Sequence, residues 1–96
     1  DTPIGLPANL AQYAALTMMI AEATGYEAYE YVHSFSDAHI YVDQIPYVEE
    51  MLKRDDKVFP TMKMKKKKDF FDYRVDDFIL EDYEPHPGIW DIPVAI

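Results

Sequence analysis

Cysteine is absent from the 96 residues of this chain. Without a thiol, these residues can provide no disulfide, no sulfur ligand for a metal and no cysteine nucleophile. Arginine is nearly as scarce, since only Arg54 and Arg74 occur, and the formal net charge is −9 at pH 7. Phosphate backbones attract proteins with an excess of lysine and arginine, so the composition argues against general nucleic-acid binding.

Long apolar runs are also missing. No stretch approaches the roughly 20 apolar residues of a membrane-spanning helix. The opening residues DTPIGLP lack the basic flank and the small-residue cleavage site of a signal peptide. We therefore expect a soluble, cytoplasmic protein. Hydrophobic residues make up 49% of the chain and aromatic residues 15%, which is enough for one small core and for one domain at most.

The spacing of apolar residues predicts two helices. From Asn9 to Thr24 they recur every three or four positions, between Pro7, which can open a helix, and Gly25, which can end one. This helix is apolar almost all round, so we expect it to be largely buried. A second helix is expected from Ile45 to about Arg54, with its proline in the first turn, where proline is tolerated.

Aromatic and β-branched residues predict two strands, at 26–35 and 38–42, joined by a short turn. Further strand candidates are 59–64 and 78–80, and the intervening DFFDYRVDD is expected to be helical or turn-like. The lysine-rich run 63–68 is interpreted as a solvated strand end and turn rather than a nucleic-acid patch. These strands have no obvious partners, and little of the chain is left to cover the first helix. The chain is therefore expected to be a piece of a larger domain.

Three collinear segments resemble the thymidylate synthase family. GLPANLAQYAALTMMIA resembles the central helix and its approach loop, SDAHIYVDQ resembles the D-x-H-x-Y strand, and FDYRVDDFILEDYEPHPGIWDIPVAI resembles the closing segment. The resemblance implies an α+β fold with a mixed sheet packed on a long buried central helix. It also implies that residues 1–96 form the C-terminal portion of one such domain, about its last third, beginning just after the family's nucleophilic cysteine.

What the resemblance implies for function is the reductive methylation of dUMP to dTMP, with methylenetetrahydrofolate as one-carbon and hydride donor, in a homodimer. This chain would supply base and sugar recognition, part of the folate wall and a closing tail. It would not supply the nucleophile, so the chain is expected to be inactive without the remainder of the protein. The alternatives are a deoxycytidylate hydroxymethylase-type relative of the same fold and a catalytically inert acidic interaction domain.

The resemblance implies that three residues bind dUMP. Asn9 falls where the family reads the uracil edge, and an amide can both accept from and donate to that edge. Taken alone, Asn9 is better explained as a helix N-cap; the motif around it reverses this preference. His39 and Tyr41 fall where the family binds the deoxyribose hydroxyl, and two positions apart in a strand they share one face. An isolated HIY would instead favour a core histidine. Asp37 is given no catalytic role.

The resemblance also implies that five residues contact the folate, namely Asp1, Gly5, Leu6, Ala95 and Ile96. A carboxylate at Asp1 can accept from ring N–H groups, and glycine permits close approach of the backbone. Ala8 departs from the family pattern, which usually has phenylalanine at this position, and this leaves the shape of the folate pocket in doubt.

The tail EPHPGIWDIPVAI is stiffened by prolines and carries apolar side chains to bury, namely Ile89, Trp90, Ile92 and Val94. The resemblance implies a lid that closes over nucleotide and folate, with Ile96 at its end. A metal site is not expected, because the spacing of His33, His39 and His86 fits no common zinc site.

Overall fold

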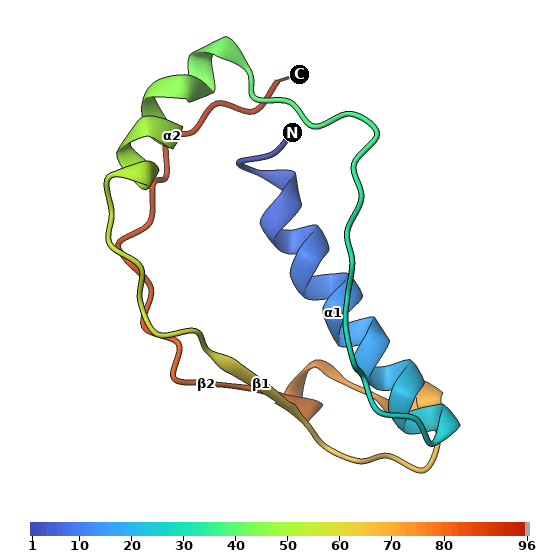
Figure 1. The fold of residues 1–96 in the computed structure, drawn as a ribbon. Helices are drawn as coiled ribbons and strands as arrows, with labels where there is room; N and C mark the ends of the chain where they lie inside the picture. The colour runs from blue at the N-terminus through green and yellow to red at the C-terminus, as the bar shows by residue number, and fades with distance from the viewer. Residues whose placement is uncertain (96) are drawn as a thin grey trace.

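The computed structural model describes residues 1–95. Figure 1 shows an open arrangement in which the chain runs down α1, returns to α2, continues through a two-stranded sheet and comes back along α2 as the C-terminal tail. The elements in order are α1 (Gly5–Thr24), η1 (Val42–Gln44), α2 (Ile45–Leu52), β1 (Thr61–Met64), η2 (Phe70–Asp72), η3 (Val75–Asp77) and β2 (Phe78–Glu81), where η marks a 3₁₀ turn.

The first predicted helix is present, and it is longer than the pattern indicated. α1 begins at Gly5 rather than Asn9, because the turn before it is already closed by Asp1: the Gly5 N–H donates to the Asp1 carbonyl over 3.1 Å and the Ile4 N–H donates to Asp1 Oδ1 over 3.1 Å. Pro7 therefore lies in the first turn, where its missing N–H costs no helical hydrogen bond. The helix ends at Gly25, whose φ of 76° is the left-handed conformation expected there.

The predicted burial of α1 is not observed, since none of its residues is buried in this chain. The whole chain exposes 8160 Å², whereas a compact monomer of this mass would expose roughly 5,700 Å². Its radius of gyration is 16.2 Å, against about 12–13 Å for a compact chain of this length. Within residues 1–95, no hydrophobic side chain is buried. The chain's own elements are too few to cover an apolar helix on all sides.

The two strands predicted at 26–35 and 38–42 are wrong as strands. Neither segment pairs with a neighbour in the described chain, although aromatic rings still alternate along the first one, with Tyr31, His33 and Phe35 in successive contact. A strand needs a hydrogen-bonded partner, and sequence propensity records only the preference for extended backbone. The preference is met here without the pairing.

The later elements follow the predictions more closely. α2 ends at Leu52, two residues before the predicted end. β1 pairs antiparallel with β2, with Met62 opposite Leu80 and Met64 opposite Phe78, so apolar residues face each other on one side. β1 starts at Thr61, two residues later than the candidate. Only two strands pair in the described residues, so the α+β class is present and the larger mixed sheet is not.

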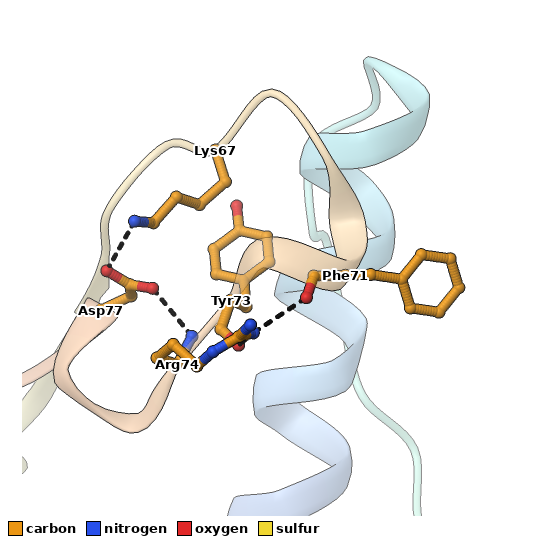
Figure 2. A network of polar contacts seen from close by, with 5 residues as sticks. All are labelled: Lys67, Phe71, Tyr73, Arg74 and Asp77. Atoms are coloured by element: carbon orange, nitrogen blue, oxygen red, sulfur yellow. Dashed lines mark hydrogen bonds and ion pairs between the residues drawn. The ribbon is translucent and has the colours of Figure 1, made fainter.

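The segment between β1 and β2 contains two 3₁₀ turns, η2 and η3, which agrees with the prediction that DFFDYRVDD is helical or turn-like. Contacts of the Asp77 side chain hold this segment in place (Figure 2). Asp77 Oδ2 accepts the Arg74 N–H over 2.8 Å, and Oδ1 forms an ion pair with Lys67 Nζ over 3.1 Å. The Arg74 N–H bond is the main cause of a lowered pKa for Asp77, which is only 5% exposed. The lysine run thus begins at the end of β1 and continues into an exposed turn, as predicted, with Lys67 tied to Asp77.

Candidate functional site

A small open cavity of about 160 Å³ lies where the start of α1 meets the segment 33–38. Three of the residues predicted to bind ligands line it together, and the other side is formed by residues far along the chain. The lining residues are Asp1, Thr2, Leu6, Asn9, His33, Phe35, Asp37 and Ala38. The backbone of Thr2 holds the two sides together, since its N–H donates to the His39 carbonyl over 2.9 Å.

Asn9 lies in the second turn of α1 and its side chain is exposed toward this cavity. The N-cap interpretation is therefore wrong, because the helix begins four residues earlier and the cap position is Ile4. An exposed amide on a helix face keeps its acceptor and both donors available, which is what reading a base edge requires. The position excludes the capping role, and the binding role of Asn9 stays a prediction.

His39 and Tyr41 lie on the same face, as the spacing predicted: their rings meet edge to face with centroids 5.0 Å apart and planes at 82°. His39 Nδ1 lies 3.1 Å from the Asp37 carbonyl oxygen and 3.4 Å from its carboxylate. A carbonyl can only accept, so Nδ1 carries the proton and Nε2 of a neutral His39 is an acceptor. His39 Nε2 is thus set to accept a hydrogen bond from a hydroxyl group, and Asp37, given no catalytic role from the sequence, fixes this tautomer.

Asp1 is held by two hydrogen bonds, one to each carboxylate oxygen. Oδ1 accepts the Ile4 N–H over 3.1 Å, and Oδ2 accepts from Gln44 Nε2 over 2.9 Å. A carboxylate has about four acceptor positions, so the group is oriented and still has capacity for a ligand's N–H donors. Beside it, a Cβ added at Gly5 would meet no atom of the described residues within 4 Å. Open space therefore adjoins Gly5, as a ligand wall requires.

Leu6 contributes to a second, apolar cleft as well. This cleft has a volume of about 250 Å³ and lies between the start of α1 and α2. Its lining is formed by Thr2, Pro3, Leu6, Pro7, Ile40, Val48 and Met51. The hydrogen bond from Gln44, the residue before α2, to Asp1 links the two sides.

Hydrogen bonds hold the tail along α2. Two of them run from the side chains of Arg54 and Gln44 to backbone carbonyls of the tail, and one runs from the tail residue His86 to a backbone carbonyl near the end of α2. Near the end of α2, Arg54 Nη1 donates to the Pro87 carbonyl over 2.7 Å and His86 Nε2 lies 2.7 Å from the Asp55 carbonyl. Near the start of α2, Gln44 Nε2 donates to the Pro93 carbonyl over 2.8 Å. Figure 1 shows the tail running past α2 toward the N-terminus.

The apolar side chains of the tail are only partly covered. Ile89 and Ile92 are half-buried, whereas Trp90 is 90% exposed and Val94 is 62% exposed. Ala95, predicted to contact the folate, is exposed, and Ile96 lies outside the described residues. The tail is fixed at both ends of α2, and its tryptophan is almost fully exposed among residues 1–95.

Gln44 is the residue that sequence reasoning missed. It lies at the end of the quoted motif SDAHIYVDQ, and no local pattern distinguished it from a surface glutamine before a helix. In the structure it is completely buried, with partners 43 and 49 residues away in sequence. His33 and Phe35 were likewise not predicted to line the cavity. Their only sequence signal was alternation along an extended segment.

Two searches of the described residues gave negative results. No group of three or more His, Asp or Glu side chains is placed to hold a metal ion within residues 1–95. In the same part of the chain, neither helix has the length and apolar character needed to cross a membrane.

Comparison with known proteins identifies relatives along the full chain. A sequence model of the family described as thymidylate synthase matches residues 1–96. The chain is also similar to the thymidylate synthase of Saccharomyces cerevisiae, with 43% identity over 90 residues. That match covers 93% of this chain and 30% of the yeast protein, so the chain spans less than a third of the length of this relative.

Proposed function

Because the chain belongs to the thymidylate synthase family, we propose that it is part of an enzyme that converts dUMP to dTMP with methylenetetrahydrofolate as one-carbon and hydride donor. The observation that carries the proposal is the cavity at the start of α1, where Asp1, Leu6 and Asn9 gather beside His39. Asp1, Leu6 and Asn9 come from the first nine residues and His39 from a separate segment, and all four are expected to contact folate or nucleotide.

In this proposal, Asn9 reads the uracil ring. Its carbonyl accepts the ring N–H and its NH₂ group donates to the neighbouring ring carbonyl. An amide turned over would instead match cytosine, so its surroundings must fix its orientation. Asp37 and the other polar groups that line the cavity with Asn9 are candidates for that task.

His39 and Tyr41 bind the deoxyribose. The Nε2 of neutral His39 accepts from the sugar hydroxyl, because Nδ1 already donates to the Asp37 carbonyl. The Tyr41 phenol lies against the His39 ring and supplies a donor on the same face.

Asp1, Gly5 and Leu6 form part of the folate wall. The bound folate supplies the one-carbon unit and the hydride. Asp1 accepts from the N–H donors of its pterin ring through the acceptor positions that Ile4 and Gln44 leave unused. Gly5 leaves space along the helix start, and Leu6 offers an apolar surface. Ala8 stands in place of an aromatic ring, and Phe35 supplies an aromatic side chain to the cavity that Leu6 and Asn9 line.

The tail serves as a closing segment, with Ala95 and Ile96 at its end. Its prolines reduce the entropy lost on ordering, and its attachment along α2 aims it toward Asp1. A closed tail excludes water from the cavity during the reaction. The 90% exposure of Trp90 is consistent with a segment that has further surface to bury on closing.

The nucleophile must come from elsewhere, because the chain has no cysteine. We infer that residues 1–96 are a portion of one domain rather than an independent domain, and that the chain is inactive without the remainder of the protein. The lack of a buried apolar core in residues 1–95 supports this. A cytoplasmic location and a homodimer in which a partner subunit adds phosphate-binding arginines are part of the same proposal.

The test is the substitution Asn9→Asp in the full-length protein. We expect dTMP formation from dUMP to fall, and the preference for uracil over cytosine nucleotides to fall at least about tenfold, the usual cost of one unsatisfied polar contact. Lys68→Gln is the matched control, because it changes the net charge by the same amount at an exposed position of the lysine-rich run that does not line the cavity.

Each outcome discriminates between functions. An unchanged preference in Asn9→Asp would contradict the role of Asn9. Hydroxymethylation of dCMP by the unaltered protein would favour the hydroxymethylase alternative, and absence of both activities in the full-length protein would favour an inert interaction domain.

A further inference from the structure

Gln44 is unusual among the described residues because its side chain is completely buried in a chain that buries almost nothing else. Its exposure is 0%, and within residues 1–95 the only other buried residue is Asp77, at 5%. Polar side chains are rarely placed in this way unless their hydrogen bonds are satisfied. The contacts of Gln44 therefore explain why it is buried.

All strong hydrogen-bonding groups of the Gln44 amide are used. Oε1 accepts the Tyr41 N–H over 3.0 Å, and Nε2 donates to Asp1 Oδ2 over 2.9 Å and to the Pro93 carbonyl over 2.8 Å. The two hydrogens on Nε2 match two groups that accept. Since the Tyr41 N–H only donates and the Pro93 carbonyl only accepts, the orientation of the amide is fixed by its partners.

The partners belong to three separate parts of the proposed site. Tyr41 is in the sugar-binding motif, Asp1 is in the folate wall, and Pro93 is three residues before the end of the tail. The base of the tail is held independently, through Arg54 and His86. Gln44 is thus the contact that holds the outer part of the tail to the folate side of the cavity.

We propose that Gln44 is a positioning residue that couples closure of the tail to the orientation of Asp1. This inference rests on the proposed function and deepens it. When the tail lifts, one hydrogen of the buried amide loses its acceptor, and the amide can rotate away from Asp1. When a folate orients Asp1, the amide is held with its second hydrogen toward Pro93. Coupling of this kind is reciprocal, so folate binding favours the closed tail and the closed tail favours folate binding.

The experiment uses the full-length protein with Gln44→Met and Gln44→Glu. Methionine keeps the volume without donors, and glutamate keeps the shape and the acceptor but removes both donors. Lys68→Gln, at an exposed position of the lysine-rich run, is the control for an equivalent change of charge. Three quantities are measured: KM for methylenetetrahydrofolate with kcat, Kd for dUMP, and the rate at which chymotrypsin releases the peptide Asp91–Ile96, with and without the folate.

For both Gln44 variants we expect KM for the folate to rise about tenfold, as for the loss of one hydrogen bond to a carboxylate, while Kd for dUMP stays within about twofold. Release of the tail peptide should accelerate by a similar factor, and addition of folate should no longer slow it. The Lys68→Gln protein should behave like the unaltered protein in all three measurements.

The opposite results are distinct. Faster tail release with an unchanged folate KM would overturn the coupling, because Gln44 would then hold only the tail. Equal losses in folate and dUMP binding would overturn it as well, because they indicate general damage to the site. If the unaltered full-length protein forms no dTMP, the proposed function fails and the folate coupling with it, while the tail-release rates still decide whether Gln44 holds Pro93.

Discussion

Arg54 provides the sharpest test of how the tail is attached. Its guanidinium lies at the end of α2 and donates to two acceptors, the Pro87 carbonyl over 2.7 Å and Glu50 Oε1 over 3.2 Å. The first bond holds the base of the tail and the second lies within the helix surface. The perturbation is Arg54→Met in the full-length protein, which retains an apolar side chain of similar reach and removes both donors.

The expected magnitude follows from the two contacts. A hydrogen bond from a charged donor contributes about 1.5–3 kcal/mol, and the side chain of Arg54 is 24% exposed, so the lower end applies. The pair with Glu50, four residues away and itself 58% exposed, adds only about 0.3–0.5 kcal/mol. Loss of the Pro87 bond should therefore favour the detached tail by about 1.5 kcal/mol, roughly tenfold in population.

The assay is release of the peptide Asp91–Ile96 by chymotrypsin cleavage after Trp90, followed by mass spectrometry. When opening and closing are fast compared with cleavage, the rate is proportional to the population of detached tail. We expect about tenfold faster release from Arg54→Met. The matched variant Glu50→Gln removes the helix pair but keeps the Pro87 bond, and it should accelerate release by no more than about twofold.

Two results would refute this reasoning. Equal acceleration in Arg54→Met and Glu50→Gln would mean that the helix pair, rather than the bond to Pro87, holds the tail. No acceleration in either variant would mean that the base of the tail is fixed by other contacts, such as that of His86 with Asp55.

Three further predictions concern acid stability, the tail end and the isolated chain. The Arg74 N–H holds the pKa of Asp77 below its ordinary value of 3.8, so Asp77 stabilises the fold above that pH and loses this effect as pH falls through the lowered pKa. In urea unfolding of the full-length protein, the Asp77→Asn variant should be less stable than the unaltered protein at neutral pH. A difference in stability that persists undiminished in strong acid would contradict this. Deletion of Ile96 should reduce turnover of the full-length enzyme far more than dUMP binding, and equal losses would argue against a lid. Residues 1–96 expressed alone should melt without a cooperative transition because no hydrophobic side chain is buried within residues 1–95, and a sharp calorimetric transition would instead support an independent domain.

Local sequence rules succeeded where the deciding interactions are local. The repeat of apolar residues located α1, and Gly25 marked its end, because both features depend on contacts within one or two helical turns. Alternation of Met62 and Met64 located β1, whose partner β2 follows after one short excursion. The start of α1 was placed four residues late because the closing bonds come from Asp1, outside the apolar pattern.

The same rules failed for the segments at 26–35 and 38–42. Their residues prefer extended backbone, and the backbone is extended, but a strand also requires a neighbour that the described chain does not provide. The prediction that α1 is buried was wrong for a related reason, because the exposure of a helix depends on which elements pack against it. An apolar helix surface indicates that other elements should pack on it, but the surface does not provide those elements.

The sequence by itself determined the family, the helix that carries Asn9, and the residue types available for recognition of base, sugar and folate. Only the tertiary structure decided that Asp1, Leu6 and Asn9 share a cavity with the segment 33–38, and that the protonated nitrogen of His39 faces Asp37. It also decided that Gln44 joins Asp1 to Pro93. The physical reason is distance along the chain: bonds between residues more than 40 positions apart leave no periodic signal in sequence, and they exist only once the chain has brought both ends to α2.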